Sequence, residues 1–210
     1  MTARDEILAR IHHALADRPA APGIPRTYRA TGQHAPGADA LVTMLTERVT
    51  DYRARLYRAT SAEVPSSVAA ALGEAGSHRV IVPSGFPDRW LPTGIEPVPD
   101  TGCGAAELDR FDAVLTGCAV AIADTGTLVL DGGIDQGRRA ISLVPDHHVC
   151  CVTAERIVGT VPEALAELDP ARPLTFISGP SATSDIELER VEGVHGPRRL
   201  DVIVVEAGGG

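Results

Sequence analysis

The hydrophobic positions at the start of the chain repeat with the spacing of an α-helix. Over residues 3–16, the apolar side chains fall on one helical face: Ile7, Leu8, Ile11 and Leu15. Proline and glycine then interrupt the pattern, and residues 18–38 are rich in Pro, Gly and Ala. We therefore predict a helix followed by an extended linker. The pattern leaves open whether this helix packs on a distant surface or on a partner chain.

From residue 38 the pattern changes to amphipathic stretches that alternate with apolar runs. Helices are expected at residues 40–49, 65–76 and 161–168. In the first half of the chain, short apolar runs predict strands at residues 55–59, 78–83, 94–99 and 111–117. Strands that alternate with helices indicate βαβ units and a largely parallel sheet.

The second half of the chain carries strand-like runs with little room for helices between them. The runs whose short joins predict antiparallel pairing are residues 118–124, 125–132, 140–145 and 147–153. Residues 175–179 and 200–207 are apolar enough to form central strands. The predicted fold class is therefore α/β, with a mixed, largely parallel sheet flanked by helices. The predicted division is an N-terminal arm at 1–37, a single domain at 38–207 and a tail at 208–210.

The composition of the chain excludes several classes of protein. The net charge of −9 argues against a nucleic-acid-binding protein, which would carry a basic stripe. No apolar run approaches the ~20 residues that span a bilayer, and the charged first helix is unlike a signal peptide. We expect a cytoplasmic protein with reduced thiols. Its four cysteines form no CxxC pair, so we expect no cofactor bound by this chain and no metal site.

The densest group of polar residues follows the predicted strand at residues 175–178. Gly179 and Pro180 turn the chain there, and hydroxyl and carboxyl groups stand at Ser178, Ser181, Thr183, Asp185 and Glu187. Ligands of open α/β sheets bind at the carboxyl ends of strands, so we interpret this segment as one wall of a small-molecule site. In the structural alternative, Asp185 only caps a short helical turn.

His195 follows in the sequence GVHGP, between two glycines. It is a candidate acid–base group, because the pKa of histidine is ordinarily close to neutral pH. It is equally a candidate for holding the loop, through a hydrogen bond to a backbone carbonyl.

A second candidate segment is Asp124–Thr127, with the sequence DTGT, between two apolar runs. Such a turn is ordinary hairpin chemistry. It also presents the Asp124 carboxylate, the hydroxyls of Thr125 and Thr127, and the free backbone N–H groups around Gly126. Such a tip binds an anion or supplies a base.

Two adjacent arginines follow a glycine-rich loop at residues 131–137. The loop matches neither established phosphate-binding pattern. A guanidinium of Arg138 or Arg139 would hold an anion bidentately, whereas the alternative is a solvated surface pair. His147 and His148 begin the next run, and neighbours on a strand face opposite sides. They are therefore poorly placed to share a metal, and one of them is interpreted as a hydrogen-bonded buried histidine.

Three segments together resemble the LUD-domain family, also called the LutC/YkgG family. They are FDAVLTGCAVAIADTGTLVL, ISLVPDHHVCCVTAERIV and FISGPSATSDIELERVEGVHGPRRLDVIVV. The resemblance covers residues 38–207. It implies a fold similar to the NagB/RpiA/CoA-transferase group and a place in a three-component system that oxidises L-lactate to pyruvate. In that system the iron–sulfur clusters belong to partner subunits. The family commonly has Glu where this chain has Asp124, which makes a direct catalytic role there less secure.

Three functional hypotheses follow. In the first, the chain is a cluster-free subunit of the lactate-oxidising system that binds a small carboxylate, or supports the partner interface, through the hydroxyl and acid loop and His195. In the second, it is a free-standing transferase or isomerase for a CoA ester or a sugar phosphate, with Asp124 as reacting carboxylate and Arg138 or Arg139 on the anion. In the third, it is a non-catalytic assembly or regulatory module that docks through its N-terminal helix.

Overall fold

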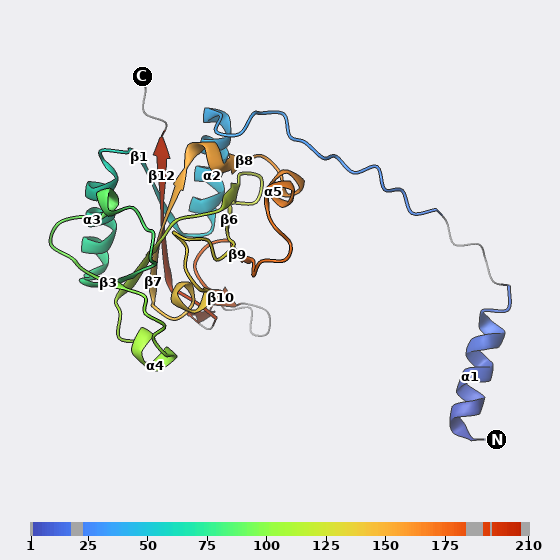
Figure 1. The fold of residues 1–210 in the computed structure, drawn as a ribbon. Coiled ribbons are helices and arrows are strands. Elements are labelled where there is room, and N and C mark those ends of the chain that lie inside the picture. The colour runs from blue at the N-terminus through green and yellow to red at the C-terminus, as the bar shows by residue number, and fades with distance from the viewer. Residues whose placement is uncertain (1, 18–22, 184–190, 194, 207–210) are drawn as a thin grey trace.

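The two larger β-sheets of the chain pack against each other (Figure 1). The computed structural model describes residues 2–17, 23–183, 191–193 and 195–206. All strand pairs of the first sheet are parallel, and its order is β1 (Arg55–Thr60), β12 (Arg199–Glu206), β7 (His147–Thr153), β4 (Ala113–Thr116), β2 (Arg79–Val82) and β3 (Glu96–Pro99). The predicted α/β class with a largely parallel sheet is confirmed.

The second sheet is smaller and mixed. Its order is β8 (Ile157–Val158), β5 (Val120–Ile122), β6 (Thr127–Leu130) and β9 (Thr175–Ile177). Strand β6 is antiparallel to both of its neighbours, whereas β5 and β8 are parallel. A separate two-stranded pairing joins β10 (Ala182–Thr183) to β11 (Val191–Glu192).

The α-helices are α1 (Ala3–Ala14), α2 (Asp39–Asp51), α3 (Val64–Ala75), α4 (Ala105–Leu108) and α5 (Val161–Glu167). Helices α2, α3 and α5 pack on the faces of these sheets, whereas α1 lies away from them (Figure 1). Short 3₁₀ turns are η1 (Asp88–Trp90), η2 (Arg139–Ser142) and η3 (Ala154–Arg156). Helix α3 begins with proline in its first turn and ends at Gly76 in a left-handed conformation, as its sequence predicts. No helix in the described part of the chain is both long and apolar enough to cross a membrane.

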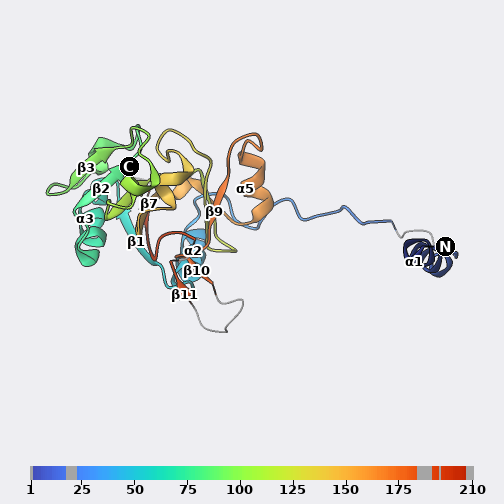
Figure 2. The ribbon, with the colours of Figure 1, turned by 90° about the horizontal axis from the view of Figure 1, so that it is seen from below.

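The layers follow one another across the molecule (Figure 2). Helix α3 covers one face of the parallel sheet, where Leu72 packs in one core with Val149 and Ile203. On the opposite face, α2 and the second sheet share a core with β7 and β12. Helix α5 covers the outer face of the second sheet. The parallel sheet is thus buried on both faces, which explains the continuous apolar runs of β7 and β12.

Several strand predictions differ from the structure. Strand β7 was expected to pair antiparallel, but it is parallel to both β4 and β12. The β5–β6 hairpin lies between β4 and β7 in the chain and takes the place of a crossover helix, so β7 runs in the same direction as β4. Residues 140–145 form no strand, because η2 and the turns after it occupy them. Strand β9 was expected to be central but lies at the edge of the second sheet.

Shortening a side chain between the sheets should destabilise the protein strongly. Leu128 is fully buried in the core that joins β6 to α2 and β12. Leu128→Ala is expected to lower the free energy of unfolding by about 2–5 kcal/mol, because it leaves a cavity that the rigid sheets cannot close. Ile134→Ala, at a side chain that is 79% exposed, should change it by less than about 0.5 kcal/mol. Urea denaturation of both variants measures the difference, and equal effects would contradict this layer arrangement.

Candidate functional site

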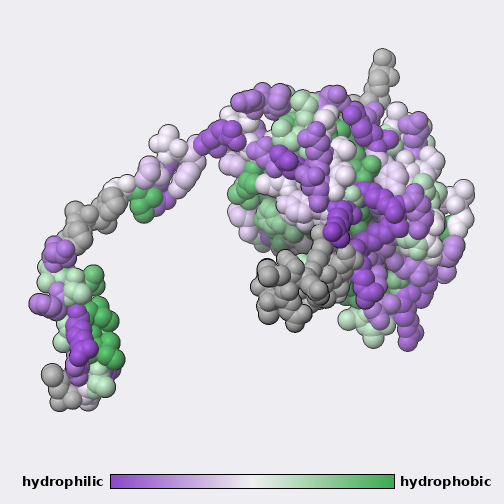
Figure 3. All heavy atoms as spheres, turned by 180° about the vertical axis from the view of Figure 1, so that it is seen from behind, coloured by the Kyte–Doolittle hydropathy of each residue, from purple (hydrophilic) through white to green (hydrophobic). Residues whose placement is uncertain are grey.

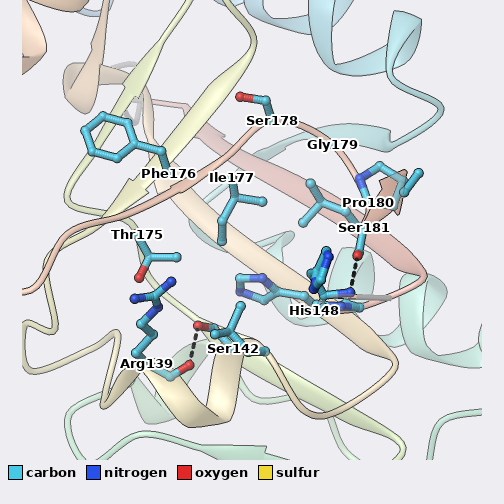
Figure 4. Close-up of a pocket in the computed structure, with 16 residues that line it drawn as sticks. Arg139, Ser142, His148, Thr175, Phe176, Ile177, Ser178, Gly179, Pro180 and Ser181 are labelled. Carbon is cyan, nitrogen blue, oxygen red and sulfur yellow. Dashed lines mark hydrogen bonds between the residues drawn. The ribbon is translucent and has the colours of Figure 1, made fainter. Parts of the chain in front are cut away.

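A cavity of about 330 Å³ opens at one end of the interface between the two sheets (Figure 4). One wall is β9 with the loop after it, from Thr175 to Ala182. The opposite wall comes from η2, from His148 on β7 and from Leu200 on β12, and residues 195–197 complete the rim. The candidate residues Ser178, Gly179, Ser181 and His195 all line it. The structure therefore brings the two polar segments SGPS and GVHGP together.

The location differs from the expected one. The cavity lies at the carboxyl end of β9, as the sequence argument assumed, but at the amino ends of β7 and β12. The rule about carboxyl ends applies to a parallel sheet. Strand β9 belongs to the second, mixed sheet, so the rule does not locate the site within the parallel sheet.

The turn at Gly179 fixes the course of the first wall. Gly179 has φ +85°, in the left-handed region that favours glycine. A Cβ atom at this position would lie 2.5 Å from Cβ of Tyr52, which follows α2. Any larger residue would therefore push the wall away from α2.

Ser181 connects the two polar segments. Its Oγ accepts a hydrogen bond from the backbone N–H of His195 at 3.0 Å. Its own N–H donates to the carbonyl of Pro197 at 2.8 Å, and its carbonyl accepts from Gly193 at 2.9 Å. These bonds hold the exposed His195 side chain at the rim of the cavity.

His148 is a site residue that sequence reasoning did not select. It is only 1% exposed, and its Nε2 lies 2.7 Å from Oγ1 of Thr116 on β4. Burial, with a smaller contribution from His147, lowers the pKa of His148 to about 3, so the ring is neutral at physiological pH. Its buried Nδ1 has no hydrogen-bond partner within the described residues. Depending on the tautomer, this nitrogen is either a donor or an acceptor.

The neighbouring His147 behaves as the alternation of side chains predicts. It points to the other face, where its Nε2 lies 2.7 Å from Asp201 and its Nδ1 lies 3.2 Å from Oγ of Ser77. One of the two histidines is therefore fully hydrogen-bonded and the other is not. The signal that separates them is Thr116, which comes beside His148 only through the pairing of β4 with β7.

The two adjacent arginines also differ. Arg138 binds Asp100 bidentately at 2.7 and 2.8 Å and donates to the carbonyl of Cys103 at 2.6 Å. This pairing is the main reason that the pKa of Asp100 lies below its usual value. Arg138, predicted as a ligand-binding residue, is thus occupied by a structural pair. Arg139 lines the cavity instead, and within the described residues no carboxylate pairs with it.

The Asp124–Thr127 turn contacts the cavity wall that β9 and the following loop form. Thr127 Oγ1 lies 2.8 Å from Oγ of Ser178 and 2.7 Å from Oγ1 of Thr125. Asp124 is exposed, with its carboxylate 3.7 Å from Arg29 of the linker. Gly126 packs so closely on Arg48 of α2 that a Cβ atom would lie 2.7 Å from Cβ of Arg48. Asp124, Thr125 and Gly126 do not line this cavity, so the catalytic role predicted for Asp124 and the ligand binding predicted for Thr125 and Gly126 stay predictions.

Three predicted residues remain, Thr183, Asp185 and Glu187. Thr183 is in β10, opposite Val191 of β11. Asp185 and Glu187 lie outside the described residues.

The next features are the possible metal ligands and the cysteine thiols of the described residues. No group of three or more His, Cys, Asp and Glu side chains suited to a metal ion occurs in the described part of the chain. All four cysteines are buried, and burial raises the pKa of the Cys151 thiol. Cys151 is therefore a packing residue with an inert thiol.

Comparison with known proteins identifies the family. The LUD domain profile matches residues 104–205, which run from the turn before α4 to β12 and include all residues that line the cavity. A lactate utilization protein C from Deinococcus radiodurans is 56% identical over 164 residues, which cover 76% of each protein. The chain belongs to the LUD domain family.

Other relatives of this LUD domain protein agree. A lactate utilization protein C from Geobacillus kaustophilus is 26% identical over an alignment that covers 96% of this chain and 95% of that protein. A crystal structure of a DUF162 family protein from Deinococcus radiodurans has a TM-score of 0.68 and 48% identity, covering 79% of this chain and 96% of that one. The two-sheet fold is thus also similar to a solved structure.

His148 should make the stability of the protein depend on pH. In the unfolded chain its pKa is near 6.5, and in the folded protein it is about 3. The unfolded state therefore binds a proton first, so the contribution of His148 is complete above pH 6.5 and declines as the pH falls toward 3. Between pH 7.5 and pH 5 this loss is about 2 kcal/mol. Chemical denaturation at both pH values measures it.

Two variants isolate the contribution of His148. His148→Gln should show a smaller decrease in unfolding free energy between pH 7.5 and pH 5, because the titrating group is gone. His78→Gln, at an exposed histidine, should keep the wild-type decrease. If His148→Gln kept it too, His148 would not be the buried neutral group that the structure describes.

Proposed function

We propose that this protein is the cluster-free subunit of a system that oxidises L-lactate to pyruvate, and that its inter-sheet cavity binds a small carboxylate. Membership of the LUD domain family, with relatives named lactate utilization protein C, supports the system. Iron–sulfur clusters on partner subunits supply the electron transfer. The role of this chain is to bind and orient the small anion.

The observation that carries the ligand proposal is the unmatched polarity of the cavity. Arg139 provides a cation without a carboxylate partner among the described residues. His148 provides a buried nitrogen without a partner in the same set. Buried polar groups such as this nitrogen are nearly always hydrogen-bonded in proteins, whereas the Arg139 side chain is exposed and open to a ligand. A ligand that accepts from Arg139 and also carries a second polar oxygen supplies both missing partners.

The geometry in Figure 4 suits such a ligand. The guanidinium of Arg139 and the hydroxyl of Thr175 lie on the same side of the cavity, and His148 lies on its floor. A carboxylate takes two parallel hydrogen bonds from an arginine. The neutral ring of His148 adds no charge, so one anionic group is balanced by one cation. Its uncommitted tautomer suits either a hydroxyl or a keto oxygen.

The transferase or isomerase hypothesis has less support. It requires the Asp124 carboxylate and an arginine beside the same ligand. Arg138 is paired with Asp100, and Asp124 lies on the outside of a hairpin near Arg29. Arg139 lines the cavity, but Asp124 does not. The reacting group of that hypothesis is thus missing from the site.

Removing the cation of the cavity should weaken ligand binding. Arg139→Gln is expected to lower the affinity for L-lactate and pyruvate at least about tenfold, because a charge-assisted hydrogen bond contributes roughly 1.5–3 kcal/mol. Isothermal titration calorimetry on the purified chain measures this change. Arg89→Gln, at an exposed arginine stacked on Trp90, is the matched control and should bind as the wild type does. Equal affinity of all three proteins would remove Arg139 from the site.

The proposed system role predicts a growth phenotype. Deletion of the chain should abolish growth on L-lactate in a host without another lactate-oxidising enzyme. Affinity purification from lactate-grown cells under anaerobic handling should recover iron–sulfur proteins. Arg139→Gln should recover the same partners, because the substitution leaves the fold intact. It should nevertheless fail to restore growth, because it removes the cation that binds the ligand. Normal growth of the deletion strain would refute the role in lactate oxidation.

A further inference from the structure

Helix α1 carries an apolar stripe that touches nothing. The stripe consists of Ile7, Leu8 and Ile11 with Leu15 directly after the helix, and these side chains are 41–59% exposed. None of residues 3–14 is buried. Figure 3 shows hydrophobic atoms gathered along one side of this helix. Solvent thus covers a surface that resembles the packed face of a helix in a protein core.

Helix α1 has a stabilising N-cap and an ion pair, but it is too short to be stable without packing on another surface. Thr2 and Asp5 form a reciprocal capping box, in which Asp5 Oδ2 accepts from the N–H of Thr2 at 2.8 Å. Glu6 and Arg10 add an ion pair one turn apart. Isolated helices shorter than about 12–15 residues are nevertheless marginal in water, and most helices gain stability from packing of their apolar face. The twelve residues of α1 therefore require a surface.

The second sheet offers a surface of matching size. Four strands at about 4.8 Å spacing make a face about 19 Å wide, whereas one helix is about 10 Å across. The seven-residue α5 packs on the β5 side of this face and shares a core with Val129 of β6. Phe176 of β9 pairs with the buried Val129 but is itself 48% exposed, so the β9 edge of this face lacks a covering helix.

Apolar side chains line both sides of this uncovered strip. On α5, Val161 and Leu165 are 39% and 50% exposed, and on β9 Phe176 is half-exposed. We call Val161, Leu165 and Phe176 the α5–β9 surface. Figures 1 and 2 both place α5 beside β9. A helix laid beside α5 would bury all three side chains in a two-helix layer.

The linker leaves the domain close to this surface. The N–H of Gly32 donates to Glu163 of α5 at 2.6 Å, and the N–H of Gly37 donates to the carbonyl of Ile157 at 3.0 Å. The sixteen residues between Leu15 and Gly32 can span up to about 50 Å. The helix is therefore anchored near the α5–β9 surface and has the reach to meet a neighbouring molecule.

We propose that α1 of one copy packs on the α5–β9 surface of a second copy, and that the two copies exchange their arms. Each copy carries both the stripe and the surface, so a twofold dimer buries both stripes and both surfaces and leaves none exposed for a third copy. The apolar stripe of α1 is not packed against the domain of its own chain. A second copy of the chain carries the same α5–β9 surface and is therefore the partner that we propose. This inference is independent of the ligand and of the lactate system.

The mass of the protein in solution tests this exchange. At micromolar concentration, sedimentation velocity should show a dimer, and a chain that begins at residue 23 should be a monomer with unchanged circular dichroism of the domain. Ile11→Glu and Leu165→Glu should each shift the protein to monomer. Ala9→Glu, on the opposite face of α1, and Ile134→Glu, at an exposed side chain elsewhere, should remain dimeric. A full-length monomer, or a dimer that persists without α1, would overturn the proposal.

Crosslinking separates exchange from docking within one molecule. Ile11→Cys and Leu165→Cys are made in separate chains, and the four native cysteines are buried. Mild oxidation of the mixed single variants should form a disulfide between two chains, and each variant alone should form much less. If only a chain with both substitutions crosslinked, within itself, the helix would dock on its own domain and the exchange would be wrong.

Discussion

The packing of the small mixed sheet on the parallel sheet is the constraint on which the other features depend. Leu128 and Leu130 on one side and Val202 and Val204 on the other share a core from which water is excluded. This core also receives α2. Two strands of the mixed sheet, β5 and β6, form the connection from β4 to β7, and the other two, β8 and β9, follow β7 in the chain. The cavity opens where the interface ends, so its walls come from both sheets.

A few polar contacts turn this open end into a defined site. Thr127 of the hairpin binds Ser178, and Ser181 binds the backbone of His195. These contacts join three segments that lie far apart in the chain. The hairpin turn, which carries the candidate catalytic residue Asp124, contributes structural support to the wall. The residues with unmatched polar groups are His148 and Arg139, on the opposite wall.

Helix α1 and the cavity show the same physical pattern at two scales. A buried nitrogen of His148 at the cavity and the apolar face of α1 each lack a partner among the described residues. At the cavity the missing partner is polar and small, and at α1 it is apolar and the size of a helix face. The two features share Phe176, which belongs to the α5–β9 surface and also borders the cavity.

The sequence by itself determined the fold class, the helices and the segments that carry the polar residues. Periodicity sufficed for α3 and α5, because an amphipathic helix records its buried face locally. The concentration of polar residues was enough to select the segments SGPS and GVHGP, and both segments line the cavity. Local sequence did not indicate the roles of His148 and Arg138, because each is defined by a partner far away in the chain. His148 contacts Thr116 through the pairing of β7 with β4, and Arg138 binds Asp100, which directly follows β3. Only the tertiary structure decided which histidine is unmatched and which arginine is free, because strand register and long-range ion pairs leave no local pattern.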